Sequence, residues 1–228
     1  MSRKLLTGMI ASAALLMSAC SITLDEAQTA SHGTFEKQYE PANIGNLNAL
    51  PDIEVVNGVT YVDGILVVNK EIPLPPDYNP GLQQEVIDAY TEMFADGAEQ
   101  GLDFTLVSDF RTYDYQAGLY NDYVARDGRE AADKYSARPG HSEHQTGLAI
   151  DVGSEDSATT LSIKFGDTPE YEWMKDVAHE YGFIVRYLEG KEEITGYQYE
   201  PWHLRYVGDE AEAIYESGLT LEEYLGID

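Results

Sequence analysis

Three short runs of β-branched residues occupy the segment from Ile53 to Val68, and a glycine-containing dipeptide separates each run from the next. These dipeptides, Asn57-Gly58 and Asp63-Gly64, accept the positive φ angles that type I′ turns need. The segment therefore predicts a small antiparallel β-meander, with strands expected at 53–56, 59–62 and 65–68.

A helical period replaces the strand pattern after the prolines at positions 73, 75, 76 and 80. Apolar residues recur every three or four positions, as they do on the buried face of a helix. We expect Gly97 and Gly101 to end this helix. The apolar stripe predicts core packing, and it consists of Leu82, Val86, Tyr90, Met93 and Phe94.

The rest of the chain alternates short apolar runs with helical patterns, and it contains no repeat or low-complexity tract. Most runs are bounded by glycine, proline or short polar segments, which are typical of turns. The pattern predicts strands at 104–108, 148–152, 183–187 and 203–207, and helices at 113–126, 129–135, 170–181, 209–216 and 220–225.

With 228 residues, the chain is long enough for one domain with a core of its own. Composition divides it further. We expect a signal peptide at 1–19, a polar flexible tether at 20–50, a β-meander with a connecting segment at 51–76, and the main folded domain at 77–228.

The first twenty residues have the features of a targeting segment. Arg3 and Lys4 precede an apolar run that ends at Met17, and this run is shorter than the roughly 20 residues of a membrane-spanning helix. Ser18-Ala19-Cys20 follows, which resembles a bacterial lipoprotein box. We therefore expect cleavage before Cys20, lipid attachment to its sulfur, and a protein held at the outer face of the bacterial cell membrane by a lipid anchor only.

Net charge limits the partners. The 41 acidic residues outnumber the 14 basic ones, giving a formal net charge of -27. Such a chain repels polyanions, so nucleic acid and an anionic membrane surface are poor candidates as electrostatic partners. A solvated acidic surface explains the charge without a specific function, and adaptation to a salty medium is the alternative. Because Cys20 is the only cysteine, the chain cannot form an intramolecular disulfide.

Two short stretches concentrate residues that could bind a metal. His141 to Asp151 contains two histidines and Glu200-Pro-Trp-His203 contains a third, out of five in the chain. A catalytic zinc site uses three nitrogen or oxygen ligands and leaves a fourth position for water, and His144, Asp151 and His203 fit that requirement. Lone histidines are more often structural, and we interpret His32 and His179 in that way.

A hydrolytic metal site also needs a base. Zinc lowers the pKa of a bound water toward about 7, and Glu200, three residues before His203, is the natural acceptor of its proton. Glu143 adjoins His144 but, in an extended segment, neighbours point to opposite sides, so we do not expect it to take this role. His141 is a candidate for the outer shell of the metal or for the pocket.

Arg111 lies where an expected strand meets an expected helix, a common position for functional residues. Its planar guanidinium suits a substrate carboxylate. It could instead stabilise the oxyanion of a tetrahedral intermediate, or form a surface ion pair with one of the many carboxylates.

The stretch Ser142-Glu-His-Gln-Thr-Gly-Leu-Ala-Ile-Asp151, together with Glu200-Pro-Trp-His203, resembles the zinc D-alanyl-D-alanine carboxypeptidases of the VanY type and the related L,D-carboxypeptidases. The resemblance extends from about Ile65 to Val207. It implies an α+β fold, shared with the hedgehog signalling domain, in which helices flank a small antiparallel sheet. It also implies zinc bound by His144, Asp151 and His203, Glu200 as the catalytic base, and a terminal D-alanine pocket formed by Arg111, Gln116, Ser142 and Tyr187.

The expected activity is removal of a carboxy-terminal D-alanine from peptidoglycan stem peptides, by a protein for which a monomer is favoured. The alternatives on the same fold are a cell-wall endopeptidase and a D,D-dipeptidase. A non-haem iron oxygenase also uses two histidines and a carboxylate, but its site has no use for Glu200. An inactive, metal-stabilised wall-binding module is the remaining alternative, and the sequence does not choose between tetrapeptide and pentapeptide substrates.

Overall fold

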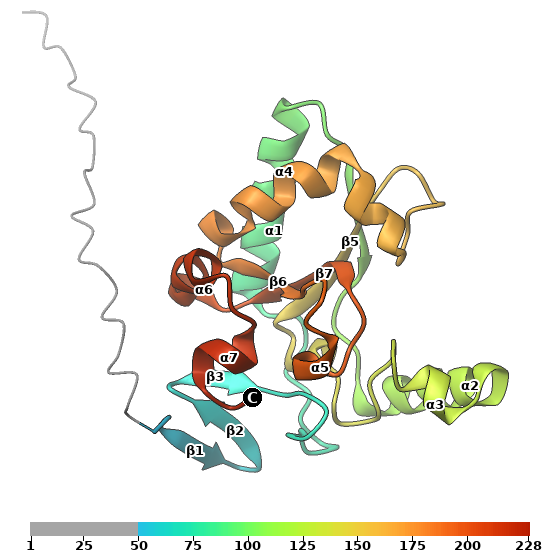
Figure 1. The fold of residues 1–228 in the computed structure, drawn as a ribbon, viewed down its shortest axis with the longest axis vertical. Helices are drawn as coiled ribbons and strands as arrows, with labels where there is room; N and C mark the ends of the chain where they lie inside the picture. Colours follow the sequence, from blue (N-terminus) through green and yellow to red (C-terminus); the bar gives the residue numbers. More distant parts are fainter. Residues whose placement is uncertain (1–49) are drawn as a thin grey trace, which may run out of the picture. The chain divides into compact units, whose positions relative to one another are not determined.

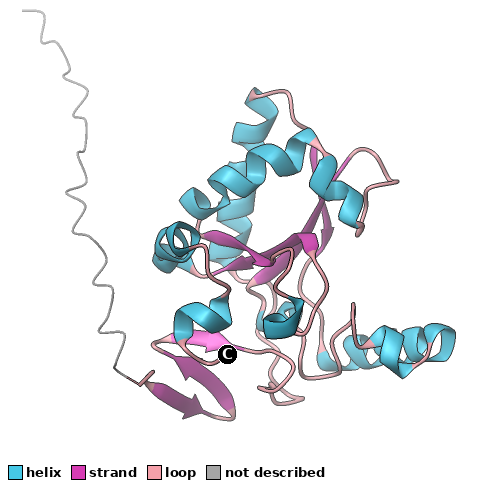
Figure 2. Ribbon diagram, viewed as in Figure 1, coloured by secondary structure: helices cyan, strands magenta, loops and turns pink. Residues whose placement is uncertain are grey.

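The computed structural model describes residues 50–228 (Figure 1). The expected signal peptide, Cys20 and nearly all of the expected tether lie outside the described residues. The described part contains a three-stranded sheet and a four-stranded sheet with helices around them, so the predicted α+β class is confirmed. Figure 2 separates these helices and strands by colour. Across residues 50–228, no helix combines the length and apolar character needed to cross a bilayer.

The predicted meander is present. It consists of β1 (Ile53–Val56), β2 (Val59–Val62) and β3 (Ile65–Val67), paired antiparallel in that order. Both turns have the expected geometry, because Asn57 and Gly58 have φ angles of 52° and 81°. Val62 and Val67 pack against Ile184 and the C-terminal helices, so the meander shares a core with the segment that follows it.

The larger sheet is antiparallel throughout and has the order β4-β5-β7-β6. Its two central strands pair Asp151 directly with His203. Because successive side chains alternate between the faces of a strand, the neighbours Ile150 and Leu204 point to the other side and enter the main core. The strands are β4 (Phe104–Ser108), β5 (Ala149–Ser154), β6 (Phe183–Tyr187) and β7 (Glu200–Tyr206).

Helices α1 (Gln84–Glu99) and α4 (Pro169–Val177) cover the apolar face of this sheet (Figure 1). Val86 and Met93 of α1 and Met174 of α4 are fully buried in the same cluster as Ile150 and Leu204. These helices leave the face that bears Asp151 and His203 free for other elements. The predicted apolar stripe of α1 is therefore confirmed as core.

Short elements surround the rest of the sheet. The 3-10 helix η1 (Glu143–Thr146) contacts β5, while α6 (Ala211–Ser217) and α7 (Leu221–Leu225) pack on the opposite side from α1 and α4, with the meander. The remaining helices are α2 (Tyr113–Asp127), α3 (Arg129–Ala132), α5 (Glu192–Thr195), η2 (Ile163–Asp167), η3 (Ala178–Tyr181) and η4 (Gly208–Glu210).

Three expectations about local structure were wrong in detail. Gly97 does not end α1 but lies inside it, where a Cβ atom would come within 2.8 Å of the Phe104 ring. It is therefore a close-packing residue, and Gly101, with a φ of 78°, follows the helix end. The helix expected at 170–181 changes to 3-10 geometry after Val177. The last strand begins at Glu200 rather than His203.

Gly147 ends η1 with a left-handed φ of 72°, and a Cβ atom added there would collide with the backbone carbonyl of Gly81. Both the conformation and the collision oppose a side chain. We expect Gly147→Ala to cost about 3 kcal/mol or more and to lower the midpoint of thermal unfolding by about 10 °C, as measured by circular dichroism.

Gly118→Ala is the matched control. Gly118 lies in α2 and has free space around its Cα atom, so alanine there should stabilise the protein by about 0.5–1 kcal/mol. Equal effects of the two substitutions would contradict the assigned role of Gly147.

Candidate active site

His144 is presented to the sheet by η1. Its Nδ1 atom lies 2.7 Å from the carbonyl oxygen of Asp109, and because a carbonyl only accepts hydrogen bonds, Nδ1 carries the proton. The lone pair of Nε2 then faces Asp151, with Nε2 3.2 Å from Oδ2 of that residue. The backbone carbonyl of Asp109 thus orients the imidazole of His144.

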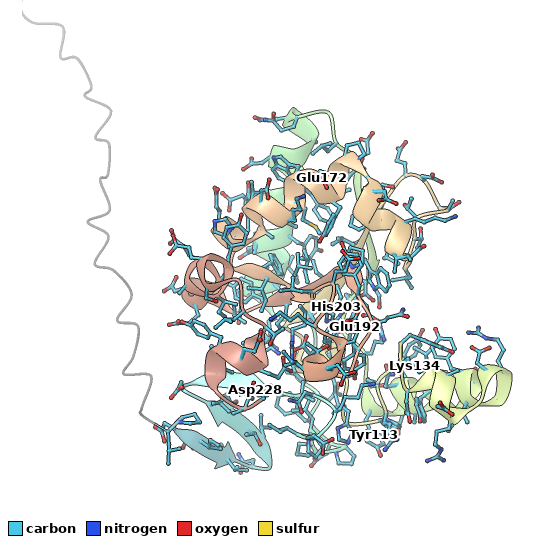
Figure 3. All side chains as sticks on the ribbon, viewed as in Figure 1. Tyr113, Lys134, Glu172, Glu192, His203 and Asp228 are labelled. Atoms are coloured by element: carbon cyan, nitrogen blue, oxygen red, sulfur yellow. The ribbon has the colours of Figure 1, made fainter. Side chains whose placement is uncertain are left out.

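Asp151 and His203 approach from the paired central strands. His203 Nδ1 lies 2.9 Å from Asp151 Oδ1, and one ligand atom from each of His144, Asp151 and His203 lies within 4.8 Å of the others. All three residues are buried. Figure 3 labels His203 at the sheet, among closely packed side chains. The structure therefore brings together the three residues expected to bind a metal.

Burial and charge set the protonation of this group. Burial alone would raise the pKa of Asp151, but the charges and hydrogen bonds of His144 and His203 hold it well below its usual range. Burial lowers the pKa of His144, and the nearby Arg111 lowers it further. An ionised carboxylate and a neutral imidazole are the forms in which these residues bind metals.

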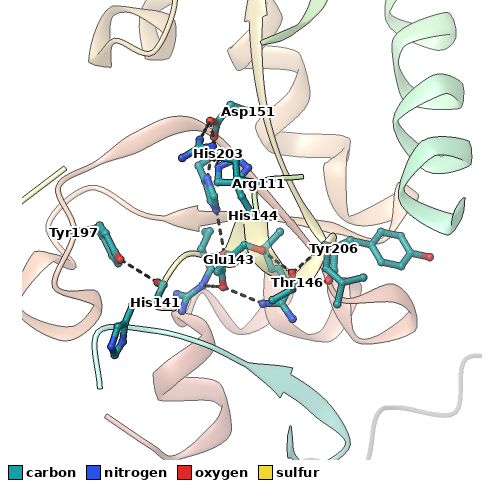
Figure 4. A network of polar contacts seen from close by, with 12 residues as sticks. Arg111, His141, Glu143, His144, Thr146, Asp151, Tyr197, His203 and Tyr206 are labelled. Atoms are coloured by element: carbon teal, nitrogen blue, oxygen red, sulfur yellow. Dashed lines mark hydrogen bonds and ion pairs between the residues drawn. The ribbon is translucent and has the colours of Figure 1, made fainter. Parts of the chain in front are cut away.

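The second nitrogen of His203 contacts a residue for which the sequence predicted no role here. His203 Nε2 lies 3.0 Å from Glu143 Oε2 (Figure 4). Glu143 belongs to a 3-10 helix rather than an extended segment, so the expectation that it points away from the site was wrong. Burial disfavours its charge, but Arg186 and Arg205 hold the pKa of Glu143 below its usual range.

The sequence contains a signal for this network that could have been used. Arg186 and Arg205 stand in strands that are otherwise mostly apolar, Phe-Ile-Val-Arg and Trp-His-Leu-Arg. Both are about 1% exposed. Since a buried arginine needs an acidic partner, their positions indicate that a carboxylate must lie inside the domain. The pattern does not tell which of the 41 acidic residues it is.

Glu200, the expected base, begins β7 and is buried. Burial raises its pKa to about 8, although the charge of His203 acts in the opposite direction. A carboxyl group with a pKa near neutrality can both accept and return a proton. Glu200 lines the same cavity as His144, Asp151 and His203, so its position and its acidity both agree with the predicted role.

Arg111 extends into the group of expected ligands. Its Nη2 donates to Asp151 Oδ2 at 2.8 Å and lies 2.8 Å from His144 Nε2. Ser108 and Gln116 accept from its other nitrogens at 3.1 and 3.2 Å. Arg111 thus forms a partly buried ion pair with Asp151 rather than an ion pair at the surface. Gln116 is fully buried and lies behind Arg111, so its direct role in substrate binding stays a prediction.

These residues line a cavity of about 540 Å³. Ser142 and Tyr187 lie in its wall, and the Tyr187 ring stacks on His203 with centroids 4.9 Å apart. One side of α2 forms a further wall, because Tyr115, Leu119 and Tyr123 recur at intervals of four residues. The cavity therefore extends beyond the metal group along a helix with aromatic side chains.

The two other histidines that the structure describes, His141 and His179, do not belong to the group of expected metal ligands. His141 Nδ1 contacts the carbonyl oxygen of Asn69 at 2.8 Å, and its own carbonyl accepts from Tyr197. It borders the site without joining the ligand group. His179 stacks on Tyr215 with centroids 3.9 Å apart. His32 lies outside the described residues.

A divalent transition metal fits this donor set. Two imidazole nitrogens and a carboxylate are a common ligand set of catalytic zinc, and the protein leaves room for water. Each imidazole has an acceptor on its far nitrogen, which is the usual arrangement around a metal-binding histidine. Burial opposes protonation of His203, yet its hydrogen bonds to Asp151 and Glu143 raise its pKa to about 9. A metal ion would take the place of the Nδ1 proton.

Comparison with known proteins agrees with this geometry. The VanY family, described as D-alanyl-D-alanine carboxypeptidase, matches residues 79–209. A putative carboxypeptidase from Bacillus subtilis, YodJ, is 35% identical over 92% of this chain and 91% of its own length. The crystal structure of DacB from Streptococcus pneumoniae has a TM-score of 0.71 and 46% identity, covering 78% of this chain and 96% of that one.

A vancomycin resistance D,D-pentapeptidase, VanY, solved in complex with Zn(II), has a TM-score of 0.60 and 34% identity, covering 70% of this chain and 97% of that one. The resemblance inferred from the two sequence motifs is thereby confirmed. The chain belongs to the VanY family of D-alanyl-D-alanine carboxypeptidases.

Proposed function

We propose that this protein is a zinc carboxypeptidase that removes the terminal D-alanine from peptidoglycan stem peptides. The observation that supports this most directly is the convergence of His144, Asp151 and His203 beside Glu200 and Arg111 in one cavity. The VanY relative solved with Zn(II) supports zinc as the metal. When bound, zinc would polarise the scissile carbonyl and make water more acidic.

Residues of the protein supply proton transfer and substrate binding. Glu200 accepts the proton of the attacking water and passes it to the departing amine, which its raised pKa favours. Arg111, whose guanidinium faces the cavity, binds the free carboxylate of the substrate or the developing oxyanion. Recognition of a free carboxylate would restrict cleavage to the last residue. Ser142 and Tyr187 border the same space.

The wall formed by α2 provides room for the peptide that precedes the scissile bond. Tyr115, Leu119 and Tyr123 offer a partly exposed apolar surface along the cavity. Two of them are tyrosines, whose rings supply contact area at a small cost in conformational entropy. We propose that stem-peptide residues amino-terminal to the cleaved alanine lie against this wall.

The comparisons favour the tetrapeptide over the pentapeptide as substrate. A second structure of DacB, an L,D-carboxypeptidase, is 44% identical over 97% of that chain, whereas the D,D-enzyme VanY is 34% identical at similar coverage. We therefore propose L,D-carboxypeptidase activity as the main reaction, with D,D-carboxypeptidase activity as the alternative. A dual dipeptidase and carboxypeptidase, VanXYC of Enterococcus gallinarum, is 37% identical over 69% of this chain.

To test this function, zinc-loaded protein is incubated with purified tetrapeptide, pentapeptide or cross-linked muropeptides. The products are analysed by mass spectrometry. We expect loss of one alanine, faster from the tetrapeptide. Amidation of the terminal carboxylate should abolish turnover, because Arg111 then loses its ionic partner. Cleavage within a cross-bridge, or turnover that survives Glu200→Gln undiminished, would contradict the proposal. Loss of a general base should lower kcat by about 10²–10⁴-fold.

The buried carboxyl group of Glu200 also predicts a dependence of stability on pH. Its pKa rises from 4.5 to about 8 on folding, so its contribution to stability is present below pH 4.5 and is lost as pH rises toward 8. Glutamine remains neutral throughout. With a chelator present, Glu200→Gln should match the wild type near pH 4 and exceed it by up to about 4 kcal/mol at pH 8.

Chemical denaturation at several pH values measures this difference. Asp209→Asn, in the exposed η4 turn, is a control that should show no comparable gain. A Glu200→Gln variant that is less stable than the wild type at pH 8 would contradict the burial of an uncompensated carboxyl group.

We further propose that the protein is an exported lipoprotein, anchored through Cys20 to the outer face of the cell membrane. The charged start, the apolar run and the Met17-Ser-Ala-Cys20 sequence support this assignment. In a bacterial host, wild-type protein should take up radiolabelled palmitate and sediment with membranes, whereas Cys20→Ala should lose the label. Equal labelling of the two proteins would exclude attachment at Cys20.

A further inference from the structure

Glu143 has more strong polar contacts than its position beside a metal ligand requires. Oε2 accepts from His203 Nε2 at 3.0 Å (Figure 4). Oε1 accepts from Arg186 Nε at 2.8 Å and from Arg205 Nη1 at 3.0 Å. Glu143 as a whole residue is 2% exposed. Both of its oxygens are thus used, and each is used for a different kind of partner.

The two arginines are themselves fixed by other parts of the chain. Arg186 forms a bidentate ion pair with Glu222 of α7, in which Nη1 lies 2.7 Å from Oε2. Arg205 donates to the carbonyl oxygens of Leu66 in β3 and Tyr206, at 2.6 and 3.0 Å. Contacts with α7 and with β3 of the meander therefore fix Arg186 and Arg205, the two arginines that bind Glu143.

An ordinary buried salt bridge is the simpler explanation of this cluster. Buried ion pairs stabilise a fold weakly, because desolvation offsets their attraction, so stability alone gives little reason to bury Glu143, Glu222 and two arginines. Their charges sum to zero. The geometry adds a specific feature that a stabilising pair does not need, since Oε2 is turned away from the arginines and toward the imidazole of His203.

That contact determines which nitrogen of His203 is available to a metal. A neutral imidazole has one proton, and a carboxylate at Nε2 can only accept it. When a metal displaces the second proton, the remaining one would therefore stay on Nε2, and Nδ1, which lies 2.9 Å from Asp151 Oδ1, would be free to bind the metal. His144 has the opposite arrangement, because the carbonyl of Asp109 accepts from its Nδ1. The two histidines thus offer different nitrogens.

We propose that Glu143 is a positioning residue of the metal centre: it fixes the tautomer and orientation of His203 so that Nδ1 binds the metal, and its contacts with Arg186 and Arg205 hold it in place. This inference rests on the metal assignment made under the proposed function. A charged acceptor also makes the imidazole a stronger ligand than a backbone carbonyl does.

Two variants separate positioning from stability. Glu143→Gln removes the charge that faces His203, whereas Glu222→Gln removes an equivalent buried charge from Arg186 without touching His203. Zinc affinity is measured for folded protein by competition with a chromophoric chelator. We expect Glu143→Gln to weaken zinc binding by about 10–100-fold. Glu222→Gln should lower the unfolding temperature but keep zinc affinity within about threefold.

The cobalt-substituted proteins provide a second readout. The d–d absorption bands of cobalt report ligand geometry, so they should shift in Glu143→Gln and remain those of the wild type in Glu222→Gln. Equal loss of zinc affinity in both variants, in proportion to their loss of stability, would overturn the proposal and leave the cluster with a structural role only.

A measurement on the wild type keeps the test independent of whether the variants fold. Long-range ¹H–¹⁵N correlation of the zinc-loaded protein shows which nitrogen of His203 carries the proton. We expect a protonated Nε2 and a metal-bound Nδ1, and a proton on Nδ1 would overturn the proposal. None of these three measurements requires turnover, so a protein that passes them all but does not cleave muropeptides would contradict the proposed substrate and leave this inference intact.

Discussion

Asp151 and His203 stand opposite each other on neighbouring antiparallel strands, and much of the structure serves to keep this pair both aligned and buried. The same alternation that directs their side chains to one face sends Ile150 and Leu204 into the main core. A slip of one residue in β7 would exchange the two sets. The hydrophobic core on one face therefore specifies the register, and the register specifies the metal site on the other.

Burial of the charged residues on the polar face of the sheet costs desolvation free energy, and ion pairs with nearby arginines offset part of this cost. Arg186 and Arg205 balance Glu143 and Glu222, while Arg111 balances Asp151. Glu200 has no such direct ion pair among the described contacts, and its raised pKa reflects this. The proposed catalytic base thus differs from these ion-paired carboxylates in lacking a direct cationic partner, which is how a fold obtains different chemistry from identical side chains.

The sequence alone predicted the meander, the α1 stripe and the central strands, because these depend on local turn chemistry and periodicity. It also predicted the three expected ligands, which the structure brings together. It did not predict that Glu143 faces His203, since this depends on η1 being a 3-10 helix closed by the contact of Gly147 with Gly81. Nor could it show that Gly97 accommodates Phe104. Both features depend on how separate elements pack against each other, which a local sequence pattern does not show.

The ion pair between Arg186 and Glu222 has a consequence for how the protein is made. Chains emerge from the ribosome amino end first, and Glu222 follows His203, the last of the three expected ligands, along the chain. While α7 is still to be synthesised, the guanidinium of Arg186 lacks this partner, even though every ligand already exists. The buried charges around the site are therefore balanced only when α7 is present, so the C-terminal helix belongs to the same folding unit as the three expected ligands.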